Sequence, residues 1–250
     1  MELETKEKTL IIGAGEIGKS LGGVLSVAYD VNFKDVKDEV EGEFPVINVC
    51  YPYSKKFIEI TNGYIKRYNP ELVLIHSTVP VGTTRKIGKL AVHSPVNGRH
   101  PNLQESILAF TKFIAGTSAP EVMLANVFLR RAGIKTMLFS SPEATELAKI
   151  SCTSIQYALD LIKAKEINRL CDKYGVPFHE VYTAWNSVYN EGYDKLGEKR
   201  FHRTNLYPMS GGIGGHCVMA NCELLDDDIT KFVKERNKLY NKIDGRNKTG

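Results

Sequence analysis

The sequence contains no run of apolar residues long enough to cross a membrane as a helix. Such a span needs about 18 consecutive apolar residues, and none occurs in this chain of 250 residues. The first eight residues are mostly charged or polar and lead directly into an expected strand, so they do not resemble a secretory signal. We therefore expect a cytoplasmic protein with no membrane partner.

Cysteine is scarce, and neither sign of charge dominates. The five cysteines are an odd number at scattered spacings, which predicts reduced thiols. Cys217 and Cys222 are too far apart for a CxxC pair, so no metal site is expected. The 33 basic and 29 acidic residues are spread along the chain. Because a nucleic-acid-binding protein clusters its basic residues on one face, no nucleic-acid partner is expected.

The first half of the chain alternates short β-type runs with helical segments, which is typical of a parallel α/β sheet. Helices are expected over Lys55–Arg67 and Pro120–Ala132. The segment 31–45 is short for a crossover helix, so we expect a trimmed sheet there. The expected strands are Thr9–Ile12, Ser26–Tyr29, Val46–Cys50, Leu72–Ser77, Lys89–His93, Lys112–Ala115 and Lys135–Phe139.

A glycine pattern, GxGxxG, follows the first expected strand. Gly13 allows a tight turn, Gly15 allows a pyrophosphate to approach the backbone, and Gly18 allows the helix to pack closely on the strand. The helix that follows begins with Glu16 and Ile17, and its free amides favour phosphate. The pattern alone is weak, but its strand–turn–helix context predicts a Rossmann-type dinucleotide site. The alternative is a helix-entry loop without a ligand.

Asp30 stands at the end of the second expected strand, 17 residues after Gly13. A carboxylate at that place accepts hydrogen bonds from the ribose hydroxyls and repels a 2′-phosphate. The expected cofactor is therefore NAD rather than NADP. The alternative for Asp30 is an exposed side chain without a ligand.

The pattern changes near residue 140. Ser140 is expected to cap a long helix that runs to Tyr174 and stops at Gly175. Further helices are expected over His179–Asn190 and Asn221–Asn241, followed by a disordered tail over Asp244–Gly250. We therefore predict two domains. The first, 1–140, is an NAD-binding Rossmann domain, and the second, 141–250, is a long central helix with a small helical domain. The wide apolar stripe of the helix over 141–174 predicts a homodimer.

Three further motifs carry polar or nucleophilic groups. Ser77 and Thr78 follow a buried strand and would lie at the carboxyl edge of the sheet, near the cofactor. Lys149 lies in the long helix, where a lone lysine is more often solvated. Cys217 follows paired glycines and a histidine, and exposed amides with a nearby imidazole favour a reactive thiolate. An inert buried cysteine is the alternative.

Taken in order, these motifs resemble the UDP-glucose/GDP-mannose dehydrogenase family over most of residues 9–222. The matching stretches are IIGAGEIG at 11–18, STVPVGTT at 77–84, TELAK at 145–149 and GGIGGHC at 211–217. The resemblance implies that the primary alcohol of a nucleotide sugar is oxidised to a carboxylate with two NAD+. It further implies that Cys217 forms a thiohemiacetal and then a thioester, that Lys149 stabilises the oxyanion, and that Thr78 helps to hold the water.

The sequence departs from the family at positions that carry its chemistry. Val96, Thr153 and Asn221 stand where the family has Glu, Asn and Asp. The residues after Asn221 suffice for one helix, so we expect a short form without the family's C-terminal nucleotide-sugar-binding domain. Two alternatives therefore stay open beside a nucleotide-sugar dehydrogenase. One is a two-electron β-hydroxyacid-type dehydrogenase, and the other is a dimeric NAD-binding module with lost or altered catalysis.

Overall fold

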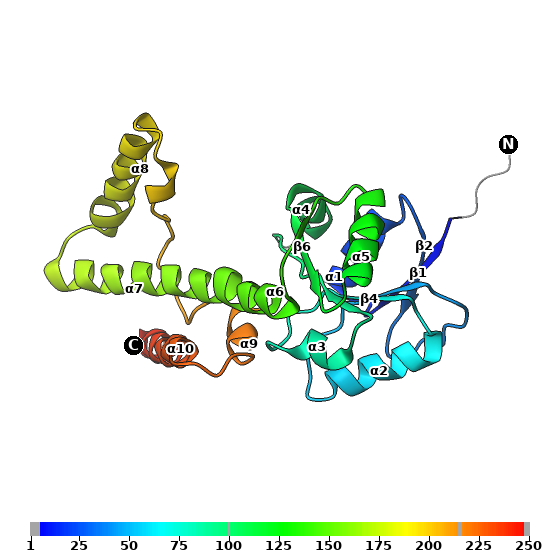
Figure 1. Cartoon of the computed structure of the whole chain (residues 1–250). Helices are drawn as coiled ribbons and strands as arrows, with labels where there is room; N and C mark the ends of the chain where they lie inside the picture. Colours follow the sequence, from blue (N-terminus) through cyan, green and yellow to red (C-terminus); the bar gives the residue numbers. More distant parts are fainter. Residues whose placement is uncertain (1–5, 100, 215–216, 248–250) are drawn as a thin grey trace. The chain divides into compact units, whose positions relative to one another are not determined.

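The computed structural model describes residues 6–99, 101–214 and 217–247. The chain divides into two compact units, residues 1–149 and 150–250 (Figure 1). The sequence had suggested a boundary near residue 140. Helix α6 (Pro142–Ala148) belongs to the first unit because its Thr145 and Glu146 side chains are hydrogen-bonded to a strand and a loop of that unit.

The first unit is built on a seven-stranded sheet in the order β2-β1-β3-β4-β5-β6-β7. Strands β5 and β6 pair antiparallel, and the other neighbours pair parallel. The predicted α/β class with a Rossmann-type sheet is confirmed. The strands are β1 (Lys8–Ile12), β2 (Asp30–Lys34), β3 (Val46–Val49), β4 (Leu72–Ile75), β5 (Ala91–His93), β6 (Lys112–Gly116) and β7 (Thr136–Leu138).

Strand β2 lies at one edge of the sheet, and no helix covers the segment 35–45 that joins it to β3. The expectation of a trimmed sheet at this point is confirmed. The predicted strand Ser26–Tyr29 is wrong. Those residues form the turn after α1, and the strand itself begins at Asp30.

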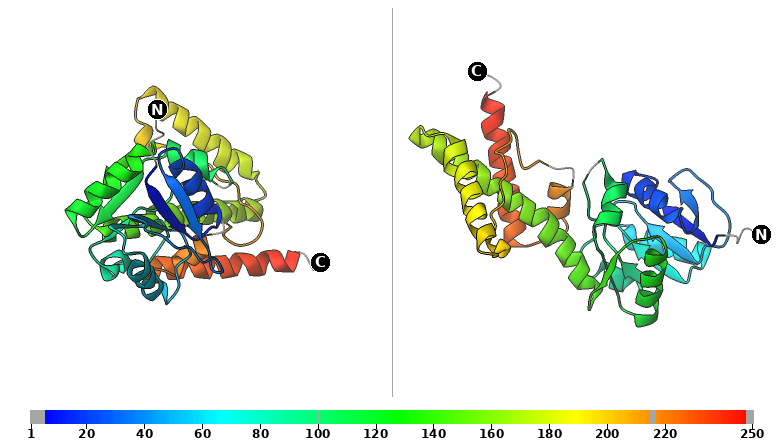
Figure 2. Two further views of the ribbon diagram at one scale, coloured as in Figure 1. Left: turned by 90° about the vertical axis from the view of Figure 1, so that its right-hand side faces the viewer. Right: turned by 90° about the horizontal axis from the view of Figure 1, so that it is seen from above.

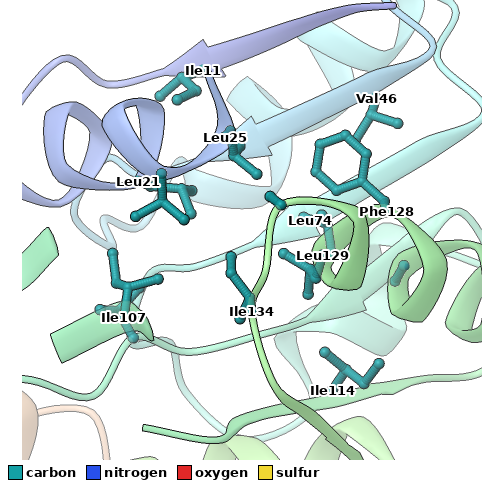
Figure 3. Close-up of a cluster of buried hydrophobic side chains, with 14 of the residues drawn as sticks. Ile11, Leu21, Leu25, Val46, Leu74, Ile107, Ile114, Phe128, Leu129 and Ile134 are labelled. Atoms are coloured by element: carbon teal, nitrogen blue, oxygen red, sulfur yellow. The ribbon is translucent and has the colours of Figure 1, made fainter. Parts of the chain in front are cut away.

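Helices cover both faces of the sheet (Figure 1). One face carries α1 (Glu16–Leu25), α4 (Leu103–Ala109) and α5 (Ala119–Arg131), and the other carries α2 (Phe57–Tyr68) and α3 (Thr83–Ile87). Side chains alternate between the faces along each strand. Ile11 therefore packs with Leu21 and Phe128 in one core, which Figure 3 shows, while its neighbours Leu10 and Ile12 pack in the other core.

The second unit is helical. A π-helical segment, Lys149–Ile155, leads into it from the first unit, and the 3-10 helix Lys199–Phe201 lies within it. Helices α7 and α10 contact each other (Figure 2). They share a core that contains Leu161, Val233 and Tyr240. The helices are α7 (Gln156–Tyr174), α8 (Trp185–Lys195), α9 (Val218–Cys222) and α10 (Asp228–Asn247), and a second π-helical segment, His179–Ala184, precedes α8.

The expected helix ends are correct in part. Gly175 ends α7 with φ of 65°, as predicted. The N-cap is Ser141 rather than Ser140, since the Ser141 hydroxyl accepts from the Ala144 amide at 3.3 Å. The prediction of disorder from Asp244 onward is wrong for the residues up to Asn247, where helix α10 ends. Once a helix has formed, each further residue adds one backbone hydrogen bond, so the helix continues through these residues. Residues 248–250 lie outside the described residues.

Within the described ranges, no helix is both long and apolar enough to cross a membrane. In the same ranges, no group of three or more His, Cys, Asp or Glu side chains lies close enough together to bind a metal ion.

Candidate functional site

The glycine loop at the carboxyl end of β1 has the geometry of a phosphate cradle. Gly13 has φ of 101°, and its amide donates to the Lys34 carbonyl at 2.9 Å. A Cβ on Gly18 would lie 2.0 Å from the Gly13 carbonyl oxygen, so this close approach of helix and strand excludes any side chain. Both glycines are therefore required by the packing of the loop itself.

Gly15 differs, because a Cβ at this position would meet nothing within 4 Å. It is the N-cap of α1 and makes no side-chain cap, so the first turn of α1 presents its backbone amides. The exposed Glu16 begins that turn, and the half-buried Ile17 packs against the core below. The open space at Gly15 and the backbone amides of the first turn of α1 can accommodate a pyrophosphate.

Asp30 does not lie at the carboxyl end of its strand, which is where a ribose-binding carboxylate is expected. Asp30 is the first residue of β2 and pairs with Lys8, so it lies at the amino edge of the sheet. The glycine loop follows Ile12 at the opposite, carboxyl edge. The reason is the misplaced strand: residues 26–29 are a turn, and β2 starts where it was expected to end.

The acidic residue at the carboxyl end of β2 is Asp35, which directly follows Lys34. Its Oδ1 accepts from the Val36 amide at 2.8 Å, and its amide donates to Asp38 Oδ2 at 2.9 Å. Since the Lys34 carbonyl holds the Gly13 amide, Asp35 lies beside the glycine loop. Sequence reasoning missed this residue, although Asn32-Phe33-Lys34 can be recognised as a strand that ends just before it.

The loop that follows β4 contains both hydroxyl residues named from the sequence. The Ser77 hydroxyl is buried and donates to the Tyr51 carbonyl at 2.6 Å, so it ties two loops together. Thr78 is half-buried at the same carboxyl edge. Gly82, with φ of 87°, turns the chain into α3.

This loop is held by a buried carboxylate that sequence reasoning did not single out. Glu146 of α6 accepts from the amides of Gly82 at 2.6 Å and Thr84 at 2.8 Å. Burial raises the pKa of Glu146, and the amide hydrogen bonds oppose that rise. Next to it on α6, Thr145 contacts His93 Nδ1 at 2.8 Å. The TELAK motif thus fastens α6 to the sheet edge.

Lys149 and the buried Lys112 bind the same short loop after β5. Lys149 Nζ donates to the Val96 carbonyl at 2.7 Å and to Asn97 Oδ1 at 3.1 Å. Lys112 Nζ donates to the carbonyls of Ser94 and Pro95, at 2.5 and 3.0 Å. Burial lowers the pKa of Lys112 to about 7, while its two carbonyl acceptors favour the charged form. The side chain of Val96 is buried in the core, so that position contributes no charge.

Cys217 lies in the second unit, exposed, immediately before α9. The neighbouring Gly215 and His216 of the predicted motif lie outside the described residues. One turn into α9, the Asn221 side-chain amide donates to Ser154 Oγ at 2.8 Å. Both of these groups are buried, so Asn221 fixes α9 to the π-helical segment. Thr153 beside Ser154 is exposed.

No family model and no curated protein matches the sequence. Solved structures do match. A UDP-D-ManNAc dehydrogenase from Pyrococcus horikoshii aligns with a TM-score of 0.73 and 18% identity over 92% of this chain and 68% of that one. A UDP-glucose dehydrogenase from Pyrobaculum islandicum gives 0.70 and 16% over 96% and 69%. The 3-hydroxyisobutyrate dehydrogenase of Mycobacterium tuberculosis gives 0.68 and 14% over 96% and 94%. At such identities these likenesses establish a fold shared with dehydrogenases.

Proposed function

We propose that this chain is an NAD-dependent oxidoreductase that oxidises a primary alcohol of a sugar-like substrate. The observation that carries the proposal is the open, amide-lined space at Gly15, between two glycines whose own packing excludes side chains. Such a loop at the carboxyl edge of a parallel sheet is the binding place of a dinucleotide. The three solved structures compared above, which share this fold, are dehydrogenases, and this supports the reaction class.

The described residues fit the cofactor. The loop Gly13–Gly18 would hold the pyrophosphate, and Asp35, in place of Asp30, would accept hydrogen bonds from the adenosine ribose. A carboxylate here disfavours the 2′-phosphate of NADP. When bound, NAD+ accepts a hydride from the alcohol carbon.

Three side chains would act on the substrate. Lys149, oriented by the Val96 carbonyl and Asn97, would stabilise a developing oxyanion. The Cys217 thiolate would add to the aldehyde carbon, and loss of a second hydride would leave a thioester. Water, held with the help of Thr78, would then cleave the thioester, which releases the carboxylate and returns the thiol. The net change is one alcohol, two NAD+ and one water to one carboxylic acid, two NADH and two protons.

Specific observations favour two other candidates. The match to 3-hydroxyisobutyrate dehydrogenase covers 94% of that chain, and a two-electron enzyme of this plan needs no cysteine. The buried Val96 and the structural hydrogen bond of Asn221 instead favour an NAD-binding module without turnover, because neither position offers a carboxylate for proton transfer.

One substrate screen distinguishes the proposed function from the two other candidate functions. Sugar nucleotides and 2- or 3-hydroxyacids are incubated with NAD+, the wild-type chain and Cys217→Ser. Two NADH per substrate molecule, with the second lost in Cys217→Ser, supports the proposal. One NADH with hydroxyacids, unaffected by the substitution, supports the two-electron enzyme. Tight NADH binding without reduction of NAD+ by any substrate supports the module.

We further propose that two copies of the chain associate through the second unit. Large apolar side chains lie exposed on α7 and α8, and Trp185 is 68% and Val188 67% exposed. An apolar hollow of about 440 Å³ lies between Trp185, Val188, Ala184 and Tyr189. Exposed apolar surface of this kind usually marks a contact with another protein surface.

A further inference from the structure

A buried lysine of α7 binds the glycine-rich loop that leads to Cys217. Lys165 is 8% exposed, and its Nζ donates to the carbonyls of Met209 and Gly211, the latter at 2.8 Å. Its ammonium also lies 5.0 Å from the centre of the Tyr240 ring. A buried ammonium is stable only while such partners face it, so Lys165 and the loop carbonyls hold each other in place.

A second contact holds the same loop from α10. The Ile213 amide donates to Asn237 Oδ1 at 2.7 Å. A Cβ on Gly212 would lie 2.3 Å from that oxygen, so glycine at 212 is what lets α10 approach the loop. The Ile213 side chain is buried in the core of the second unit.

Packing alone does not fix the start of this loop. A cavity of about 250 Å³, lined by Lys165, Met209, Ser210 and Tyr240 among others, lies against it. The Met209 side chain is 62% exposed. The loop is therefore free of close packing on this side, and the two hydrogen bonds from Lys165 supply the constraint.

We propose that Lys165 is a positioning residue for Cys217: it holds the Met209–Ile213 loop so that the thiol four residues after Ile213 is presented to the aldehyde. This inference rests on the proposed function of Cys217. The thiol takes part only after the first hydride has left, so the loop must be rigid for the second oxidation and not for the first. Loss of Lys165 therefore affects the two halves of the reaction unequally.

The test compares Lys165→Met with Lys165→Arg and with the control Lys163→Met. Lys163 lies on the same helix, and its ion pair with Asp160 is on the surface. In Lys165→Met, amide hydrogen exchange over Met209–Ile213 is expected to rise by about tenfold or more, because both hydrogen bonds to the charged group are lost. Formation of the second NADH is expected to slow by a similar factor, with the first NADH and the KM for NAD+ unchanged. Lys165→Arg restores part of both, and Lys163→Met changes neither.

Two results would overturn the proposal: unchanged exchange of the loop in folded Lys165→Met, or equal slowing of both NADH-forming steps. If Lys165→Met does not fold, Lys165→Gln, which keeps a donor and removes the charge, is measured in its place. A wild-type chain that oxidises no substrate overturns the proposed function and, with it, the role of Lys165 in positioning Cys217. The exchange measurement still decides whether Lys165 holds the loop.

Discussion

The buried carboxylate of Glu146 accepts a 2.6 Å hydrogen bond from the backbone amide of Gly82, which lies 64 residues earlier in the chain. A second amide, that of Thr84, donates to the other carboxylate oxygen. These two bonds satisfy the first amides of the short helix α3, which has no side-chain cap of its own. Glu146 therefore acts as the N-terminal cap of α3, although it comes from a distant part of the chain.

Removal of this carboxylate should destabilise the first unit. We expect Glu146→Ala to lower the free energy of unfolding by about 3 kcal/mol, because the buried amide of Thr84 and the half-buried amide of Gly82 lose their acceptor. Glu146→Gln, which keeps one acceptor oxygen, should lose less. Urea unfolding followed by circular dichroism measures the change. Glu105→Ala, at an exposed glutamate of α4, is the control, and an equal loss in both alanine variants would contradict this account.

Stability should also fall in acid, through two buried histidines. Burial lowers the pKa of His93 to about 3 and holds that of His76 well below its usual range. Unfolded histidines bind a proton near pH 6.5. Between that pH and the folded pKa only the unfolded chain is protonated, so stability is lost as pH falls, by about 1.4 kcal/mol per pH unit for each histidine.

The measurement is urea unfolding at several pH values between about 7.5 and 4.5, with other titrating groups cancelled by comparison of variants. His93→Gln should show a shallower decline than the wild-type chain. His179→Gln, at an exposed histidine, should follow the wild-type slope. Identical slopes in all three chains would show that His93 is protonated in the folded state.

The features that the sequence predicted well are those set by local backbone chemistry. Gly13 needs positive φ and Gly18 needs a missing side chain, and both needs can be recognised in a strand–turn–helix pattern. The strand expected over residues 26–29 is wrong because Val27, Ala28 and Tyr29 form an apolar run that resembles a strand. In the structure Val27 is exposed, and Tyr29 is buried because its ring stacks on Phe128 of α5, to whose carbonyl its hydroxyl donates.

The polar groups that hold the candidate site could not be predicted in this way. Glu146, Lys112 and Lys165 are charged residues that composition places on the surface. Each is buried because carbonyls or amides from distant parts of the chain surround it. Such partners are brought together only by the tertiary fold, and no spacing along the sequence marks them.

Substitution of Gly15 should separate cofactor binding from folding. A methyl group at this position meets nothing in the protein, so Gly15→Ala should unfold like the wild-type chain. It would fill the space meant for the pyrophosphate, and we expect NADH affinity to fall by about tenfold or more. Gly63→Ala on α2, where a Cβ also meets nothing, is the matched control. Fluorescence titration with NADH measures both variants, and unchanged binding by Gly15→Ala would place the dinucleotide elsewhere.

Asp30 begins strand β2 and Asp35 directly follows it, so substitutions at these two positions test which carboxylate binds the ribose. Asp35 lies at the carboxyl end of the strand beside the glycine loop, and Asp30 lies at the opposite end. We expect Asp35→Ser to weaken NADH binding about tenfold, through the loss of charge-assisted hydrogen bonds. It should also reduce discrimination against NADPH, while Asp30→Ser leaves both affinities unchanged. Calorimetric titration with each nucleotide provides the comparison. The reverse pattern would restore Asp30 as the ribose ligand.

The exposed apolar side chains of α8 predict how the chain associates. Trp185 and Val188 lie about one helical turn apart, so they share one face of α8. If that face is buried between two copies, a charge introduced there costs several kcal/mol, since it would be desolvated without a partner. Val188→Glu should therefore convert a dimer to a monomer in light scattering after gel filtration. Asp194→Asn, at an exposed residue of the same helix that is turned away from this face, is the control and should stay dimeric. A wild-type chain that is monomeric at micromolar concentration would show that this face meets no second copy.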